Sequence, residues 1–257
     1  MLIDSRREHL RNLCQQRLLA VTFIPGGQGS FFTRLLNHSG GVAQFTRSSS
    51  DQRLEGGATA HGNNEQWLSH CHHWDQAVLL NDDYFFNNLS SKTLDELDQG
   101  QGLIPFRAHP EVTRAMQKIL PGMQILYIYD LDYYRPYKLY YEKLIKPLGN
   151  QWYIEDFYRA TGKVPSYLTD DLRSKLLCRW FNHTQLTHTD FPMAYKLCVT
   201  EFFADPWHQY LNLVQHYGLT AMHKTMFDSI HDPYVRAQNT DTDSVFNKAV
   251  ELHENSK

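Results

Sequence analysis

The sequence predicts an α/β protein of three layers, with helices on both faces of a central, mostly parallel β-sheet. In residues 18–37 an apolar run, a glycine-rich turn and an apolar-periodic segment follow one another, which predicts a strand, a tight loop and a helix. Residues 103–129 have the pattern of a strand, a helix begun by Pro110 and a second strand. Such a crossover is what joins two parallel strands. Hydrophobic residues make up 42% of the 257 residues, enough to fill the core of one large domain over residues 1–257.

Composition excludes several classes of function. The net charge of −3 and the pI of about 6.5 argue against a nucleic-acid-binding face. No apolar run reaches the length of a membrane span, and the charged N-terminal residues are unlike a signal peptide. The four cysteines lie far apart, with no CxxC pair, which favours reduced thiols and a cytoplasmic location. The sequence does not indicate an oligomeric state.

The first half of the chain contains further expected elements around these two units. Residues 4–16 predict a short polar helix, and residues 82–100 an acidic helical region. Between the first helix and that region, residues 38–64 are rich in Gly, Ser, Asn and Thr. We expect a long surface loop there, with a short strand at residues 42–46. Long loops of this kind are often lids or substrate loops, although plain flexibility is the alternative.

The second half is predicted to be mainly helical. Its expected elements are a tyrosine-rich helix begun by Pro136, helices within residues 150–185, a last strand over residues 193–204, and a helix from Pro206 to Gly218. Residues 240–257 are polar, and we expect this tail to cross the surface or to fray.

The glycine-rich turn is the first candidate site. Gly26, Gly27 and Gly29 permit positive φ and a close approach of a ligand, and Ser30 can cap the helix or donate to an anion. Backbone N–H groups and the helix dipole favour an anion at such a turn. A Walker A loop is not present, because Gly29-Ser30 is followed by Phe31-Phe32 and the loop contains no lysine, which disfavours an ATPase or a kinase. A turn that binds nothing is the alternative.

His109 is the second candidate, because it ends the strand expected at residues 103–109. The glycine-rich turn follows its own strand, so the turn and His109 are expected at the same carboxyl edge of the sheet, where ligands bind in open α/β folds. An imidazole there can act as a general base near neutral pH, and capping of the next helix is the alternative role. Arg135 follows the next strand and could meet an anion, although a solvated arginine is the simpler reading.

A metal site is the third possibility, and the pattern does not favour it. His70, His72 and His73 lie close together, with His61 nearby. Adjacent histidines point in different directions on a helix, and zinc requires ligands that converge in a tetrahedron. We therefore expect no metal site.

Three segments together resemble the sulfotransferase family. FIPGGQGSFFTRLL (residues 23–36) is similar to the family's 5′-phosphosulfate loop between a strand and a helix. FRAHPEVTRAMQKILPGMQILYIY (residues 106–129) is similar to its strand with a base histidine, short helix, turn and buried strand. YKLCVTEFFADPWHQYLNLVQHYGL (residues 195–219) is similar to its late pattern of a strand, an acidic residue, Asp-Pro and a helix.

This resemblance implies a P-loop NTPase-like sulfotransferase fold. The family transfers a sulfuryl group from 3′-phosphoadenosine 5′-phosphosulfate to a hydroxyl or amine, so the expected partner is a small-molecule or carbohydrate acceptor. His109 would take the acceptor's proton, and Glu201 would have a supporting role. The residues expected to cradle the 5′-phosphate and sulfate are Gly26, Gly27, Gln28, Gly29, Ser30 and Phe31.

The chain departs from the family pattern at its charged positions. Gly27 and Gln28 stand where the family loop carries a lysine or arginine. Asp130 follows the strand that in the family leads to an arginine for the 3′-phosphate. Lys138 lies about where the family has a serine for that phosphate, so Arg135 and Lys138 are the cations left to bind the donor there. The departures keep a second interpretation open, in which the fold persists without the usual donor site and binds another anion or a partner.

Overall fold

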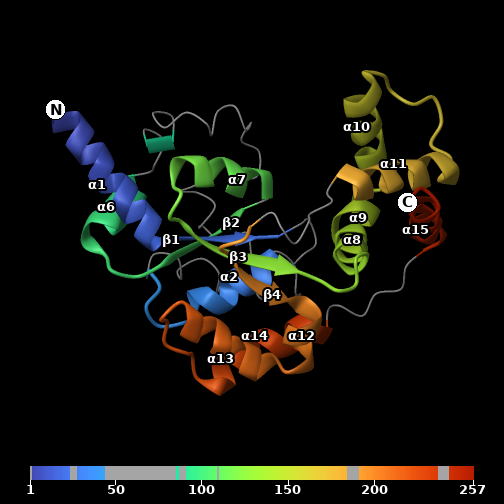
Figure 1. The fold of residues 1–257 in the computed structure, drawn as a ribbon. Coiled ribbons are helices and arrows are strands. Elements are labelled where there is room, and N and C mark those ends of the chain that lie inside the picture. The colour runs from blue at the N-terminus through green and yellow to red at the C-terminus, as the bar shows by residue number, and fades with distance from the viewer. Residues whose placement is uncertain are drawn as a thin grey trace.

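A computed structural model describes residues 2–23, 28–43, 85–86, 91–108, 110–183, 191–236 and 243–257. Helices cover both faces of a central sheet, and a further group of helices lies beside the sheet, on the side toward which the arrow of β3 points (Figure 1). The expected α/β architecture with a parallel sheet is confirmed at this level.

The sheet has four parallel strands in the order β2-β1-β3-β4 within the described residues. They are β1 (Leu18–Thr22), β2 (Ile104–Ala108), β3 (Gln124–Tyr129) and β4 (Tyr195–Cys198). All five residues of β1 are buried, because β1 is flanked by β2 and β3 and covered on both faces. Strands that are buried on both faces are nearly continuous apolar runs in sequence, and this pattern is why β1 could be predicted.

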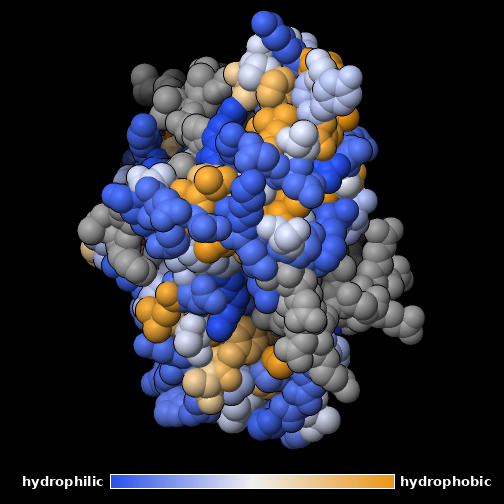
Figure 2. Space-filling view, turned by 90° about the vertical axis from the view of Figure 1, so that its right-hand side faces the viewer, coloured by the Kyte–Doolittle hydropathy of each residue, from blue (hydrophilic) through white to orange (hydrophobic). Residues whose placement is uncertain are grey.

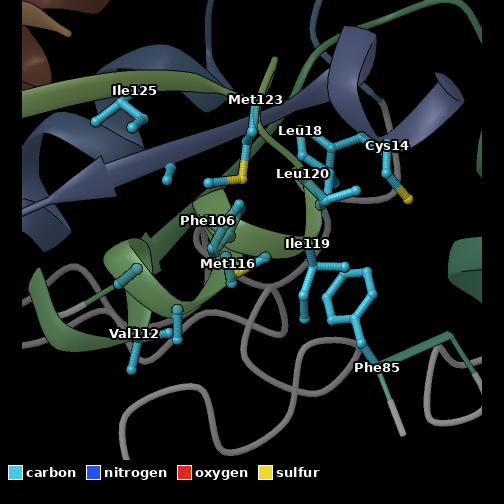
Figure 3. Close-up of a cluster of buried hydrophobic side chains, with 14 of the residues drawn as sticks. Cys14, Leu18, Phe85, Phe106, Val112, Met116, Ile119, Leu120, Met123 and Ile125 are labelled. Carbon is cyan, nitrogen blue, oxygen red and sulfur yellow. The ribbon is translucent and has the colours of Figure 1, made fainter. Parts of the chain in front are cut away.

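One face of the sheet is covered by α1 (Leu2–Arg17), α6 (Ser91–Gln99) and α7 (Pro110–Ile119). Met116 and Val112 of α7 face the sheet residue Phe106, and Cys14 of α1 lies at the edge of the same core (Figure 3). Burial raises the pKa of the Cys14 thiol to about 12, so this cysteine is unreactive at neutral pH.

The other face is covered by α2 (Gly29–Asn37), α12 (Val199–Ala204), α13 (Pro206–His216) and α14 (Lys224–Arg236). Asp205 caps α13 by accepting a hydrogen bond from the amide of His208 at 3.4 Å. Gly218 lies just after the end of that helix and has a positive φ of 63°, which is typical of the residue that terminates a helix.

The strand expected over residues 193–204 is wrong in its second half, because β4 ends at Cys198 and α12 follows. Val199, Phe202 and Phe203 are spaced three and four residues apart, which places them on one face of a helix. The ring of Phe202 packs edge-on against the ring of Phe32, with centroids 4.9 Å apart. Packing against α2 thus decides the conformation of a segment whose apolar composition suits a strand equally well.

A third core lies in the group of helices beside the sheet. It contains α8 (Arg135–Tyr140), a π-helical turn (Tyr141–Ile145), α9 (Lys146–Leu148), α10 (Asn150–Thr161), α11 (Asp170–His183) and α15 (Ser244–Glu254). Tyr137 and Tyr141 are buried in it, as their helical spacing predicted. Seen from this side, the hydrophobic surface falls in separate areas between hydrophilic residues (Figure 2).

The polar tail does not fray over its helical part. Residues Ser244–Glu254 form α15, which packs against α11 through Val245, Phe246 and Ala249. Asp243 caps the helix by accepting hydrogen bonds from the amides of Val245 and Phe246, both at 3.2 Å. The apolar residues are few, but they share one face, so the helix is buried despite its polar composition.

Parts of the expected long loop and of the expected tail lie outside the described residues. Residues 38–43 begin the expected long loop, and Val42 makes an isolated parallel bridge with Leu103; the remainder, residues 44–64, lies outside the described residues. The tail's first residues, 240–242, also lie outside them. In the described part of the chain, no helix has the length and apolar character to cross a membrane.

His253 fixes the end of α15 in the third core. Its side chain has no exposed surface and stacks on the ring of Tyr133, with centroids 5.4 Å apart and planes 3° apart. Its Nδ1 lies 2.6 Å from the hydroxyl of Tyr134. The pKa of His253 is lowered, first by burial and then by the charge of Lys257, while Glu254 acts in the opposite direction. The folded protein therefore favours neutral His253.

We predict that this histidine makes the protein less stable in mild acid. The unfolded chain takes up a proton near the ordinary pKa of 6.5 and the folded chain only below it, so stability is full above that pH and falls as the pH drops through it. A His253→Gln variant should show a weaker loss of unfolding free energy between about pH 7.5 and pH 5. Chemical denaturation at both pH values measures this.

His9→Gln is the matched control, because that side chain is exposed on α1. Its pH dependence should equal that of the wild type. Equal pH dependence for His253→Gln and the wild type would show that burial of His253 does not govern the response.

Candidate functional site

The candidate site lies where the four parallel strands end. Thr22 of β1 is paired with Ala108 of β2 and with Tyr127 of β3, and Tyr129 is paired with Cys198 of β4. The segments that follow these strands therefore emerge at one edge of the sheet. This is the edge at which open α/β sheets bind ligands.

The start of α2 differs from the expected glycine geometry. The N-cap residue is Gln28, which has a left-handed conformation with a φ of 65°, and Gly29 is already helical. Ser30 does not cap the helix, because it lies two residues after the N-cap. Gly26 and Gly27 lie outside the described residues.

Gly29 is required for close packing. A Cβ at this position would lie 2.0 Å from the nearest ring atom of Phe23, closer than any side chain could tolerate. The glycine thus lets α2 begin directly against the last described residue after β1. Its role is close approach of the chain to itself, rather than positive φ.

Arg107 is the residue that the sequence interpretation missed. Ile104, Phe106 and Ala108 belong to the core on the α7 face, so alternation places Arg107 on the α2 face. Its Nη1 donates a hydrogen bond to Oγ of Ser30 on α2. Burial lowers the pKa of Arg107 to about 10, so it remains positively charged at neutral pH.

Arg107 therefore brings a cation to the start of α2, where the loop sequence has none. The two residues are 77 positions apart, so only the pairing of β1 with β2 brings them together. An arginine inside an otherwise apolar strand, two residues before the expected histidine, was the sequence signal that could have identified it.

The helix terminus itself can bind an anion. The amides of Phe31 and Phe32 donate to the carbonyl of Gln28 at 3.0 and 3.2 Å, so the first two helical amides, of Gly29 and Ser30, are the ones that an anion would meet. The Phe31 ring packs on Tyr234, with centroids 4.2 Å apart, and is buried. Phe31 thus anchors the helix through its side chain.

Asp130, at the end of β3, is a buried acid whose side chain is 2% exposed. Its Oδ1 accepts hydrogen bonds from the Thr200 hydroxyl at 2.7 Å and from the Asp132 amide at 3.1 Å. Its Oδ2 lies 3.4 Å from Nη1 of Arg135. The structure thus pairs Arg135, a candidate anion-binding residue, with this carboxylate.

The other candidates are spread around the same edge. His109 lies outside the described residues, although its neighbours in sequence, Ala108 in β2 and Pro110 in α7, are placed. Lys138 is half-buried one turn into α8, and Glu201 is exposed in the first turn of α12. The structure therefore brings together Ser30 and Arg107, and separately Asp130 and Arg135.

Metal binding finds no support in the described part of the chain, where no group of His, Cys, Asp and Glu side chains could hold an ion. The clustered histidines, His61, His70, His72 and His73, lie outside that part, so the structure does not test them.

Comparison of the chain with protein-family models, curated proteins and solved structures finds no match. The resemblance to sulfotransferases therefore rests on the quoted residues alone. Function has to be argued from the chemistry of this edge.

We predict that Gly29→Ala destabilises the protein by about 1–3 kcal/mol, because the added methyl group overpacks the Phe23 ring. The measurement is the free energy of unfolding by chemical denaturation. Gly122→Ala is the control, since its Cβ would first meet the flexible end of Gln15, at 3.1 Å. If both substitutions lower the free energy of unfolding by the same amount, the close approach of Gly29 to the Phe23 ring does not restrict the residue at this position.

Proposed function

We propose that this chain is a sulfotransferase, which moves a sulfuryl group from a nucleotide 5′-phosphosulfate donor to a hydroxyl or amine of a small-molecule or carbohydrate acceptor. The donor expected from the resemblance is 3′-phosphoadenosine 5′-phosphosulfate. The observation that carries the proposal is the contact of Arg107 with Ser30 at the start of α2.

This contact supports an anion site because two sources of positive potential converge there. The N-terminus of a helix carries a partial positive charge of about half a unit. The Arg107 guanidinium adds a full charge in surroundings where burial has already lowered its pKa. An anion between the Ser30 amide and this guanidinium would be stabilised by both, and charge-assisted hydrogen bonds are the stronger kind.

Sulfuryl transfer suits such a site, because the reaction depends mainly on positioning and on donors to the sulfate oxygens. In the proposed step, the acceptor oxygen forms a bond to sulfur while the bond from sulfur to the bridging oxygen breaks. The acceptor proton goes to His109, and the nucleotide leaves with the bridging oxygen on its 5′-phosphate. His109 follows β2 directly, two residues after Arg107, which supports this assignment.

A second candidate function is anion or partner binding without transfer. Asp130 favours it, because a buried carboxylate at the end of β3 is unsuited to a second phosphate group. The two candidates differ in the ligand: the transferase needs a nucleotide, whereas a simple anion site would bind sulfate or phosphate equally well.

We predict that adenosine nucleotides with a 5′-phosphate bind to the wild type and that Arg107→Gln weakens this binding. Loss of one charged hydrogen bond costs about 1.5–3 kcal/mol, which is roughly a tenfold to hundredfold increase in Kd. Isothermal titration calorimetry with adenosine 5′-phosphate and with 3′-phosphoadenosine 5′-phosphate measures it, with inorganic sulfate as the comparison ligand.

Arg159→Gln is the matched control, because it removes the same charge from an exposed side chain on α10. It should bind nucleotide like the wild type. No nucleotide binding by the wild type at millimolar concentration would reject the transferase. Binding of sulfate as tight as that of nucleotide would favour the second candidate.

A further inference from the structure

We infer that the nucleotide bound at this edge carries a free 3′-hydroxyl in place of a 3′-phosphate, and that Asp130 accepts a hydrogen bond from that hydroxyl. The inference rests on the proposed function and specifies its donor as an adenosine 5′-phosphosulfate without the additional phosphate.

The position of Asp130 relative to the anion site is the first argument. Leu126 and Ile128 of β3 pack on the α2 face, so alternation directs Asp130 to that face as well. Its bond to Thr200, which lies on α12 in the same layer, agrees with this placement. Tyr127 is paired with Thr22, so Asp130 lies three residues, or about 10 Å, beyond the level at which β1 ends. The start of α2 also lies beyond the end of β1, and its Phe31 packs on Phe202 and Phe203 of α12, the helix whose Thr200 binds Asp130.

The hydrogen bonding of the carboxylate is the second argument. Among the described residues, the Thr200 hydroxyl and the Asp132 amide donate to this carboxylate, and both bind Oδ1. Oδ2 is buried and has no hydrogen-bond donor among the described residues, since the guanidinium of Arg135 stays 3.4 Å away without hydrogen-bond geometry. A buried acceptor without a donor requires an explanation, and a hydroxyl from a bound ribose would supply the missing hydrogen.

The charge at this point is the third argument. A 3′-phosphate needs positive charge, and Arg135, the first cation after β3 in the sequence, is paired with Asp130. The carboxylate is also on the opposite side of β1 from Arg107, because the strand order is β2-β1-β3. The edge thus offers a cation for the 5′ group and a carboxylate for the ribose. Carboxylates bind ribose hydroxyls at the same kind of edge in dinucleotide-binding folds.

The test compares three nucleotides on the wild type by isothermal titration calorimetry: adenosine 5′-phosphate, 3′-phosphoadenosine 5′-phosphate and 3′-deoxyadenosine 5′-phosphate. We expect the first to bind at least about tenfold more tightly than either of the others, the size of effect of one charged hydrogen bond. Asp130→Asn keeps the acceptor for Thr200 and removes the charge, so it should raise the affinity for the 3′-phosphorylated nucleotide relative to adenosine 5′-phosphate. Asp228→Asn, a half-exposed acid on α14 that is ion-paired with Lys224, is the matched control and should leave the order unchanged.

The outcomes separate the two proposals. If the 3′-phosphorylated nucleotide binds as tightly as adenosine 5′-phosphate or more tightly, the inference is overturned while the proposed function stands. An unchanged ratio in Asp130→Asn also overturns it, because Asp130 would then serve only to hold Thr200 and Arg135. If no nucleotide binds, the proposed function fails and the inference with it. Should Asp130→Asn not fold, the deoxynucleotide comparison on the wild type decides alone.

Discussion

The contact between the Arg107 guanidinium and the Ser30 hydroxyl is the interaction on which the account of this protein depends. It joins β2 to the first turn of α2 across β1, and it places a buried positive charge at the positive end of a helix. An anion bound at this point would be stabilised by both the helix terminus and the guanidinium.

The positive charge of Arg107 and the negative charge of Asp130 make the two sides of this sheet edge electrostatically different. The parallel order β2-β1-β3 places Arg107 on one side of β1 and Asp130 on the other, and both belong to the face covered by α2. A ligand with an anionic end and a neutral, hydroxyl-bearing end fits this arrangement in one orientation. The short connections after parallel strands make such asymmetry possible, because each strand contributes its residues to the same edge independently.

Sequence patterns predicted the sheet better than the site. The six-residue strand β3, five of whose residues are apolar or aromatic, and the proline-started helix α7 were expected at nearly the observed positions, because burial on both faces and helix-start chemistry are local properties. The strand expected at Val199–Ala204 was wrong, and of the two alternatives for the tail, crossing the surface or fraying, the second is excluded at Ser244–Glu254, because packing against α2 and α11 decides the two conformations. The role of Arg107 could not be predicted, since it depends on which strands are neighbours. His109, Gly26 and Gly27 stay predictions.

Soaking crystals with selenate, an anomalously scattering analogue of sulfate, tests the central claim most directly. The account predicts an anomalous peak about 4 Å from both the Ser30 amide nitrogen and the Arg107 guanidinium, with selenate oxygens within about 3 Å of each, and loss of the peak in Arg107→Gln crystals. Selenate bound elsewhere on the protein, with the start of α2 unoccupied and the Arg107–Ser30 contact unchanged, would contradict the account.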